Sequence, residues 1–212
     1  MDFRNNEEDY IKTIYTLIEA FGSANEIGIS SDLNVSMPTV SEYLNKLEAK
    51  NIIKKFNRKI YLTTYGLDLA APIMSRHRIS EVFAVKMLDV PWEESHDAVM
   101  DIEHSIDDLH FNKLRKNLGN PDRCPHGNPI NIKENPNIME FSINQVPEGR
   151  YKLSRIIYEE NNLLKKFADA SILPGQNLTF YRDGRSIVIS GNNEFKIPEK
   201  LAGSFRLVTS YE

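Results

Sequence analysis

Residues 36–63 read SMPTVSEYLNKLEAKNIIKKFNRKIYLT, and the character of this segment changes halfway along it. The first half has apolar residues at the spacing of one helix face, namely Val40, Leu44 and Leu47. This spacing predicts an amphipathic helix with one buried side. Ser36 stands where the N-cap is expected, and Pro38 suits the first turn, where its missing N–H leaves no bond unmade.

The second half of this segment predicts a β-hairpin. Two runs of β-prone residues, 52–56 and 59–63, flank the polar pair Asn57-Arg58. Upstream, apolar periodicity predicts a helix over about residues 6–21 and a short helix near residues 24–33. Three helices followed by a basic hairpin are the parts of a winged helix-turn-helix. In that motif the second helix of the pair enters the major groove of DNA, and the hairpin contacts the flanking backbone.

Charge is unevenly distributed along the chain, although the net charge of its 212 residues is only −4. Residues 36–61 carry six basic and two acidic side chains, whereas residues 92–110 carry seven acidic side chains and no Lys or Arg. Basic side chains near phosphates release counterions, so the basic segment favours DNA binding over a winged helix that only binds protein. Glu42 in the predicted recognition helix either accepts from a cytosine amine or faces solvent. The predicted DNA-binding residues are Ser36, Pro38, Thr39, Ser41, Glu42, Lys46, Lys54, Lys55, Arg58 and Lys59.

The middle of the chain is predicted to be helical. One long helix is expected over residues 64–89, with Pro72 either kinking it or delaying its start. A second helix is expected over about residues 92–108, and a short third helix over residues 109–118. Residues 120–137 are rich in Pro and Gly, which predicts a linker.

The C-terminal part is predicted to form a small β-barrel of SH3-like size. Short strands are expected at residues 141–143, 178–180, 186–189 and 205–208. Turn signals lie at residues 182–184 and 190–193, and one helix is expected over about residues 158–170. The predicted fold class is α+β, with a winged helix-turn-helix, a helical domain and this barrel. The predicted domain bounds are 1–64, 65–119 and 138–212, with the linker before the last.

Composition and motifs exclude several classes of protein. No apolar run approaches the roughly 18 residues of a membrane span, and the N-terminal residues lack the apolar core of a secretion signal. Cys124 is the only cysteine, so neither an internal disulfide nor an all-cysteine zinc site can form. The chain has no phosphate-binding loop, nucleophile elbow or zinc-protease motif, which argues against an enzyme. We therefore expect a cytoplasmic protein without membrane contact.

Histidine and acidic residues recur at helical spacing in the middle of the chain. The donors are His77 and Glu81, one turn apart, and then His96, Met100, Glu103 and His104. Imidazole, carboxylate and thioether donors together suit a first-row divalent metal such as Fe(II), Mn(II), Co(II), Ni(II) or Zn(II). The alternative is an acidic helix face that only contacts solvent. Cys124 and His126 are interpreted as part of a Pro- and Gly-containing turn rather than as a metal-binding pair.

Five short segments carry a resemblance to a known family. They are residues 8–15 (EDYIKTIY), residues 36–41 (SMPTVS), His77-Arg78 with Glu81, Glu103-His104, and residues 126–130 (HGNPI). In this order and spacing they resemble the diphtheria toxin repressor family of iron- and manganese-dependent repressors, over essentially the whole chain. The resemblance implies a winged helix that binds operator DNA, a helical domain with two metal sites and the dimer interface, and an SH3-like (FeoA-like) C-terminal domain.

The resemblance also implies which residues bind metal. The primary site would take Asp9, Met100, Glu103 and His104, and the ancillary site His77, Glu81, His96 and Glu160. Iron-type members have Met and Cys where this chain has Asp9 and Met100, and Leu163 replaces a second C-terminal ligand. Two carboxylates with one thioether favour Fe(II), with Mn(II) as the alternative. Zinc, cobalt or nickel would also bind in vitro.

The predicted function is metal-activated repression of genes for metal homeostasis by a homodimer bound to double-stranded operator DNA. Asp9 lies beside the predicted DNA-binding helices, whereas the other primary ligands lie in the helical domain, so a shared metal would favour one arrangement of the two. Two alternatives remain. One is a winged-helix regulator that responds to a non-metal ligand, and the other is a metalloenzyme that uses His77, His96 and His104.

Overall fold

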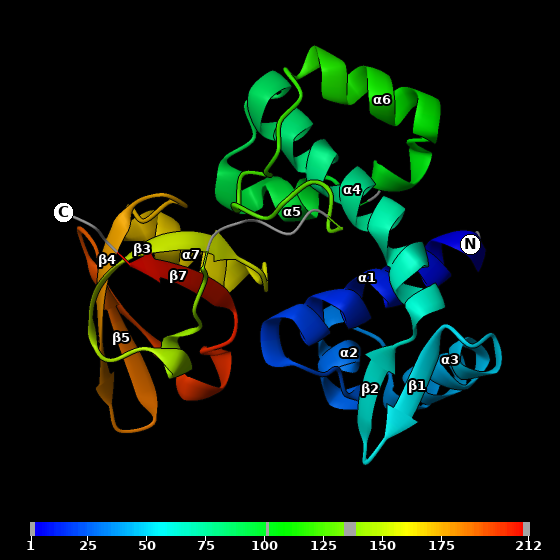
Figure 1. Cartoon of the computed structure of the whole chain (residues 1–212), viewed down its shortest axis with the longest axis horizontal. Coiled ribbons are helices and arrows are strands. Elements are labelled where there is room, and N and C mark those ends of the chain that lie inside the picture. Colours follow the sequence, from blue (N-terminus) through cyan, green and yellow to red (C-terminus); the bar gives the residue numbers. More distant parts are fainter. Residues whose placement is uncertain (1–2, 101, 134–138, 210–212) are drawn as a thin grey trace. The chain divides into compact units, whose positions relative to one another are not determined.

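The computed structural model describes residues 3–100, 102–133 and 139–209 (Figure 1). The chain divides into two compact units. Unit 1 comprises the residues up to Ser75 together with Asn131–Lys133, and unit 2 comprises Arg76–Ile130 and the residues from Glu134 onward. Residues 134–138, at the end of the predicted linker, lie outside the described residues. None of the described helices is both long and apolar enough to span a membrane.

Unit 1 combines three helices with a hairpin and confirms the predicted winged helix-turn-helix. Its elements are α1 (Phe3–Phe21), α2 (Glu26–Leu33), α3 (Met37–Ala49), β1 (Ile53–Phe56) and β2 (Lys59–Leu62). The Ser36 hydroxyl accepts from the backbone N–H of Thr39 and so caps α3 as predicted. The apolar face of α3 is buried, at Val40, Leu44 and Leu47. Local sequence signals therefore position the helix that presents the candidate DNA-binding residues.

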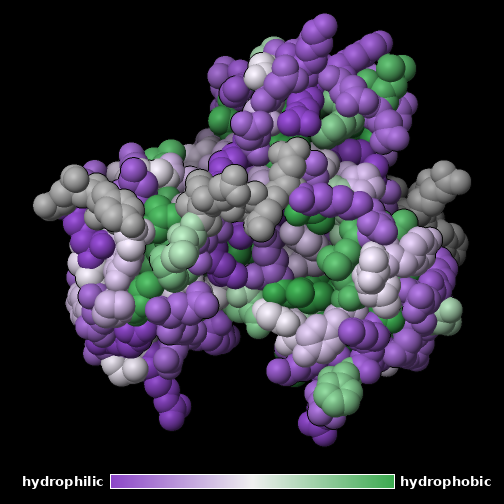
Figure 2. Space-filling model, in the orientation of Figure 1, coloured by the Kyte–Doolittle hydropathy of each residue, from purple (hydrophilic) through white to green (hydrophobic). Residues whose placement is uncertain are grey.

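The hairpin is anchored at its base and exposed at its tip. Ile60 exchanges two backbone hydrogen bonds with Ala24, of 2.9 and 3.1 Å, which fixes β2 beside the start of α2. At the tip, Asn57 and Arg58 both have positive φ angles, +50° and +61°, as in tight two-residue hairpin turns. Phe56 beside them is 67% exposed. A hydrophobic residue accordingly stands among hydrophilic ones at this projecting tip (Figure 2).

The helix α4 (Thr64–Met87) continues the chain from unit 1 into unit 2. It begins at Thr64, so Pro72 does not delay its start. Pro72 has no N–H to donate to the carbonyl of Asp68, which removes one hydrogen bond from the interior of the helix. The division between the units follows within one turn, between Ser75 and Arg76.

The predicted helix over residues 92–108 is wrong. This stretch consists of the short pieces η1 (Trp92–Glu94), α5 (Ser95–Ala98) and η2 (Glu103–Ser105). Like charges one turn apart, such as Glu93 and Asp97, disfavour a continuous helix, and Asp, His and Val are weak helix formers. The next helix, α6 (Asp108–Asn117), confirms the predicted short helix and is capped by the Asp107 carboxylate.

Unit 2 ends in a five-stranded antiparallel sheet of order β6-β5-β4-β3-β7. Its elements are η3 (Ile143–Gln145), β3 (Gly149–Ile156), α7 (Asn161–Asp169), β4 (Asn177–Asp183), β5 (Ser186–Ser190), β6 (Glu194–Pro198), η4 (Glu199–Leu201) and β7 (Phe205–Thr209). Phe167 packs edge-on against Phe195 and Phe205, which holds α7 on the sheet. The predicted α+β class is confirmed.

The sheet differs from its prediction in three places. Residues 141–143 are not a strand: they lead into η3, where Ser142 and Gln145 form a capping box. β3 and β6 are absent from the prediction because charged residues interrupt their apolar positions. In β3, for example, the buried residues Tyr151 and Leu153 alternate with exposed polar ones.

Candidate functional site

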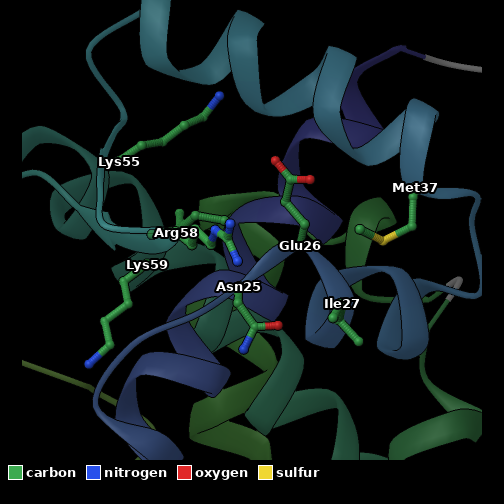
Figure 3. Close-up of a pocket in the computed structure, with 8 residues that line it drawn as sticks. Asn25, Glu26, Ile27, Met37, Lys55, Arg58 and Lys59 are labelled. Carbon is green, nitrogen blue, oxygen red and sulfur yellow. The ribbon is translucent and has the colours of Figure 1, made fainter.

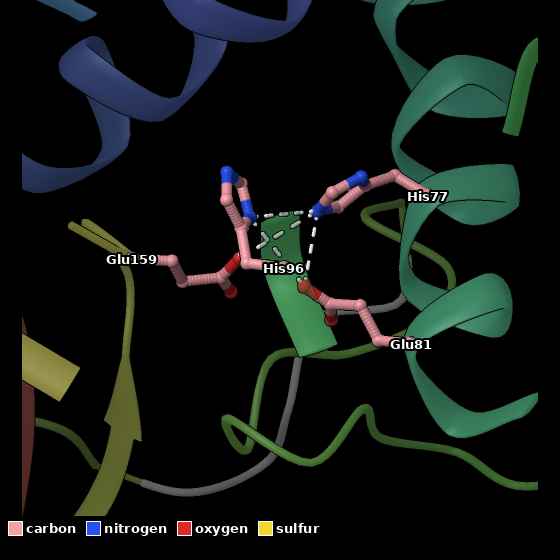
Figure 4. Close-up of side chains that lie close together, drawn as sticks. All are labelled: His77, Glu81, His96 and Glu159. Atoms are coloured by element: carbon pink, nitrogen blue, oxygen red, sulfur yellow. Dashed lines mark hydrogen bonds and ion pairs between the residues drawn. The ribbon is translucent and has the colours of Figure 1, made fainter. Parts of the chain in front are cut away.

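Four polar side chains of unit 2 converge in one buried cluster (Figure 4). His77 and Glu81 come from successive turns of α4, His96 comes from α5, and Glu159 precedes α7. His77 Nε2 lies 3.0 Å from Glu81 Oε1 and 3.0 Å from His96 Nδ1, and His96 Nδ1 lies 2.8 Å from Glu159 Oε2. One ligand atom from each of the four residues lies within 4.8 Å of the others.

A second set of donors overlaps the first. It consists of Glu81, Cys124, His126 and Glu159, again with all four ligand atoms within 4.8 Å of one another. His126 Nδ1 is 3.2 Å from Glu81 Oε1 and 3.3 Å from Glu159 Oε1, and Cys124 Sγ is 4.0 Å from His126 Nδ1. All four residues of this set are buried. The chain therefore offers three imidazoles, two carboxylates and a thiol at one place.

A tight turn delivers Cys124 and His126 to the cluster. The backbone N–H of Gly127 donates to the carbonyl of Cys124 at 2.9 Å, which closes the turn. Gly127 has a φ of +83°, and a Cβ there would lie 2.4 Å from the backbone oxygen of Ser154. Only glycine therefore lets the turn dock on β3, where the N–H of Ile156 donates to the carbonyl of His126 at 2.8 Å.

The structure brings His77, Glu81 and His96 together but not Glu160. The Glu160 carboxylate accepts from the backbone N–H groups of Asn162 and Leu163, at 3.2 and 3.0 Å, and so caps α7. Its neighbour Glu159 points into the cluster instead. Glu159 is not predicted from the sequence, where Cys124 and His126 are interpreted only as part of a turn. The sequence feature that could have indicated His126 as a ligand is the turn itself, because Cys124 and His126 lie in that turn and also supply donor atoms to the cluster.

The residues predicted for the primary site divide between the units. Met100, Glu103 and His104 lie in unit 2, around η2. The buried Glu103 carboxylate accepts a hydrogen bond from His77 Nδ1, and its other oxygen lies 3.7 Å from His104 Nε2. Asp9 lies in unit 1, on α1, with its carboxylate 3.9 Å from Lys12 Nζ. The assignment of these four residues to one metal stays a prediction.

The electrostatics of the buried cluster fit a cation. Both carboxylate oxygens of Glu81 are buried and receive no hydrogen bond within the described residues, while three imidazoles lie within 3.6 Å of Oε1. Burial by itself would raise the pKa of Glu81, but His126 and His77 hold that pKa well below its usual range. A buried charge is stable only when an opposite charge compensates it. A divalent metal bound among these donors would compensate the negative charge of Glu81.

The pKa values of the histidines in the cluster shift in the opposite direction to that of Glu81. Burial alone would lower the pKa of His126, but the carboxylates of Glu159 and Glu81 outweigh it and raise that pKa well above its ordinary value. Burial likewise opposes charge on His96, whose pKa is nevertheless raised by its hydrogen bond to Glu159 (2.8 Å) and by the nearby Glu81 carboxylate (3.6 Å). Burial raises the pKa of the Cys124 thiol to about 12, so this group is a thiol unless a metal displaces its proton.

These pKa shifts predict how the metal-free protein responds to pH. The stabilisation from charged His126 is complete below its unfolded pKa of 6.5 and is lost as pH rises through its raised folded value. The stabilisation from Glu81 and Glu159 is complete above 4.5 and is lost as pH falls through their lowered folded values. In chelator, the free energy of unfolding should therefore peak between 4.5 and 6.5 and decline towards alkaline pH.

Urea denaturation at about pH 6 and about pH 9 measures this decline. His126→Gln should remove much of it, whereas His110→Gln, which alters an exposed histidine of α6, should keep it. Equal declines in the two variants would contradict the charge pairing described for His126.

The second candidate site is the exposed surface of α3 and the hairpin. Thr39, Glu42 and Lys46 are exposed on α3, and Lys54, Arg58 and Lys59 are exposed on the hairpin. Glu42 pairs with Lys46 at 2.8 Å, which lowers its pKa and offsets one of the positive charges on α3. A concavity of about 530 Å³ lies between the starts of α2 and α3 and the hairpin. Figure 3 draws the side chains that line it. Arg58, Lys59 and Lys55 contribute positive charge to its lining.

Comparison with known proteins finds two matching family models. Residues 2–59 match the N-terminal DNA-binding domain of the iron-dependent repressors, and residues 63–132 match their metal-binding and dimerisation domain. The iron-dependent repressor IdeR of Mycobacterium leprae is 26% identical over 225 aligned residues, which cover 97% of this chain and 98% of that protein.

Solved structures of similar proteins extend over the C-terminal sheet as well. IdeR of T. acidophilum superposes with a TM-score of 0.85 at 27% identity, covering 96% of this chain and 98% of that one. The manganese regulator SloR superposes with a TM-score of 0.80, also at 27% identity and with the same coverage. Similar proteins thus include regulators named for iron and for manganese.

Proposed function

Because the chain belongs to the diphtheria toxin repressor family of metal-dependent transcriptional repressors, we propose that it binds operator DNA as a homodimer when it is loaded with a divalent metal. Fe(II) is the favoured effector and Mn(II) the alternative. The observation that carries this proposal is the buried cluster of imidazole and carboxylate donors in a chain that also contains a winged helix. The relatives are repressors, and we propose no catalytic role.

In this proposal α3 enters the major groove and the hairpin follows the flanking backbone. Thr39, Ser41 and Glu42 face the base edges, with Ser36 and Pro38 at the start of the helix. The cations of the hairpin and of α3 contact phosphates, at Lys46, Lys54, Lys55, Arg58 and Lys59. Phosphate contacts set affinity and register, whereas contacts to bases set sequence preference.

The metal-binding residues fall into two groups. The primary group is Asp9, Met100, Glu103 and His104, taken from the family resemblance. The buried group is His77, Glu81 and His96 with Glu159 in place of Glu160, and it is supported by the distances within the cluster. A metal bound by these residues supplies positive charge and fixed ligand geometry. Met100 is a soft donor from which Mn(II) gains little, and this favours Fe(II).

The primary group explains how metal controls DNA binding. Asp9 belongs to unit 1, which carries α3 and the hairpin, whereas the other three residues belong to unit 2. If all four hold one metal, each unit is restricted relative to the other. Coupling of two sites requires a ligand that prefers one arrangement, and this ligand set provides that preference.

Exposed apolar side chains on unit 2 support the homodimer. Within residues 76–130, the large apolar side chains that remain exposed include Met87 (63%), Leu88 (52%), Ile102 (37%) and Leu109 (60%). All four fall in the segment that matches the dimerisation domain. A second copy of the chain would cover apolar side chains of this kind, and a two-fold symmetric dimer suits a near-palindromic operator.

The direct test is fluorescence anisotropy with a DNA fragment from upstream of the protein's own gene. We expect weak binding in chelator and tight binding with anaerobic Fe(II), at one fixed salt concentration. Mn(II) should activate less than Fe(II) if Met100 contributes as proposed. Tight binding that ignores both metal and chelator would reject the proposed function.

The DNA-binding surface has a test of its own. Arg58→Ala should weaken binding to all DNA sequences about equally and reduce the slope of log affinity against log salt by about 0.9, the value for one lost phosphate contact. Lys165→Ala removes an exposed cation of α7 and is the matched control, for which we expect no change. An unchanged slope for Arg58→Ala would place the hairpin tip away from DNA.

A further inference from the structure

The concavity between the hairpin and the starts of α2 and α3 has apolar and cationic side chains on different elements, and we propose that it binds a free monocarboxylate with an apolar body. Its volume of about 530 Å³ lies within the range of about 300–1,000 Å³ that is typical of small-molecule pockets. A ligand bound there would exclude DNA from the hairpin. This exclusion rests on the proposed function, whereas the binding of the ligand does not.

The helices supply the apolar side of the concavity. Ile27, near the start of α2, is 73% exposed, and Met37, at the start of α3, is 40% exposed. The buried Ile60 of β2 lines the concavity as well. Covering exposed apolar side chains removes hydrocarbon surface from water, which favours binding of an apolar group, and a methionine side chain adapts to different shapes. The hydrocarbon part of a ligand would therefore lie against α2 and α3.

The hairpin supplies the cations, which lie on the other side of the concavity in Figure 3. The charge of Lys55 is already compensated, because its Nζ donates to Asn45 Oδ1 at 2.6 Å and lies 3.4 Å from Glu48 Oε2. Arg58 and Lys59 form no ion pair with another residue in the described part of the chain. These two cations are therefore available to a ligand.

The charges of the lining favour a single negative charge on the ligand. Glu26 is the one carboxylate among the described residues that line the concavity. Against the two available cations, Arg58 and Lys59, it leaves one positive charge uncompensated. A guanidinium has parallel N–H donors that match the two oxygens of a carboxylate. A monocarboxylate satisfies this balance, whereas a dianion would place excess negative charge beside Glu26.

The backbone around the concavity is held in place without a ligand. The two backbone hydrogen bonds between Ile60 and Ala24 join β2 to the segment that leads into α2. The Asn25 side chain accepts from the backbone N–H of Gly28 at 2.8 Å and so caps α2. Because these contacts already fix the elements that carry the apolar and the cationic side chains, little ordering is required when a ligand binds.

The ligand and DNA would compete for the same groups. Arg58 and Lys59 contact phosphates in the proposed complex with DNA, and a carboxylate bound to them would occupy those donors. Met37 directly precedes Pro38 and Thr39, at the end of α3 that lies in the major groove in that complex. The ligand would thus lower DNA affinity without removing the metal, and the chain would respond to two separate signals.

Methyl NMR spectroscopy of the full chain in chelator tests ligand binding without DNA or metal. The probe is octanoate, with octanol as the neutral analogue and acetate as the anion that lacks an apolar body. We expect saturable shifts of the Ile27 and Met37 methyl signals with octanoate, and binding of both analogues that is at least about tenfold weaker. Shifts that do not saturate, or equal binding of octanol, would overturn the proposal.

Two hairpin variants locate the carboxylate. Arg58→Gln should weaken octanoate binding about tenfold or more, as expected for a lost hydrogen bond between charged groups. Lys54→Gln alters an exposed cation of β1 that is not among the lining residues, so octanoate affinity should stay at the wild-type value. Equal octanoate affinity in the two variants would place the carboxylate elsewhere and overturn the proposal.

Fluorescence anisotropy tests the exclusion of DNA. At constant Fe(II) and salt, octanoate should raise the apparent dissociation constant of operator DNA in proportion to its concentration, and acetate at equal concentration should not. Ile27→Ser should bind DNA as the wild type does but require at least about four times as much octanoate, which corresponds to the burial of one methylene group. Octanoate that shifts the Ile27 and Met37 signals without weakening DNA binding would overturn the exclusion.

This inference and the proposed function can fail separately. If DNA binding requires metal but octanoate does not bind, only this inference fails. If DNA binding ignores metal while octanoate still displaces DNA, the proposed function fails and this inference stands.

Discussion

Replacing Asp9 with alanine is expected to abolish the metal dependence of DNA binding while leaving the fold intact. In the proposed primary group, Asp9 is the ligand that belongs to the unit carrying α3 and the hairpin. Without it, metal held by the remaining donors no longer favours one arrangement of the units. Coupling of this kind is typically worth about 1–3 kcal/mol, or 5–150-fold in affinity. At saturating metal, the anisotropy of the variant with operator DNA should match that of the wild type in chelator.

The matched control is Asp68→Ala. Asp68 is an exposed carboxylate of unit 1, and its ion pair with Lys133 (2.8 Å) is of the surface kind that contributes about 0–1 kcal/mol. This control should respond to metal as the wild type does. A normal metal response of Asp9→Ala would show that the link between the units runs through other residues. Circular dichroism verifies that each variant is folded.

A second pair of variants, Glu159→Ala and Glu160→Ala, should separate metal binding from helix capping. Glu159→Ala removes a carboxylate from the cluster, so metal affinity there should fall by more than the 10–100-fold typical of lost outer contacts. Glu160→Ala removes the N-cap of α7, so it should keep metal affinity but lower stability by about 0.5–2 kcal/mol. The two adjacent residues thus have opposite expected phenotypes.

Both quantities are measurable on the whole chain. Trp92 is the only tryptophan, and its ring lies 5.7 Å from that of His126, so quenching of its emission by Co(II) reports binding in the cluster. Urea denaturation in chelator reports stability. The converse result, with metal affinity lost in Glu160→Ala and kept in Glu159→Ala, would favour the ligand set implied by the family resemblance over the one drawn from the distances.

The fold of unit 1 could be predicted because its signals are local. Ser36 caps the helix that follows it, and the spacing of Val40, Leu44 and Leu47 alone identifies the buried face of α3. The prediction of one helix over residues 92–108 is wrong because repulsion between like charges in this segment outweighs the helical spacing of its apolar residues. There, Glu103 is buried against His77, a contact between residues 26 positions apart that no local pattern contains.

The candidate metal site was predictable in part for the same reason. His77 and Glu81 share a face of one helix, so their proximity follows from spacing. Glu159 and Glu160 are chemically identical neighbours, and only the start of α7 determines which of them caps the helix. His126 reaches the cluster through a turn that docks on β3, and this docking depends on contacts with a strand that the sequence pattern does not indicate.

The left-handed backbone at the hairpin tip has an evolutionary consequence. Arg58 adopts a φ of +61°, a conformation that glycine takes up without steric cost and that costs other residues about 1–2 kcal/mol. Selection for stability alone would therefore replace Arg58 with glycine, whereas the proposed contact of Arg58 with a DNA phosphate would favour keeping the cation. Stability and DNA contact therefore favour different residues at position 58. In lineages where repression is no longer needed, this position should be among the first to drift.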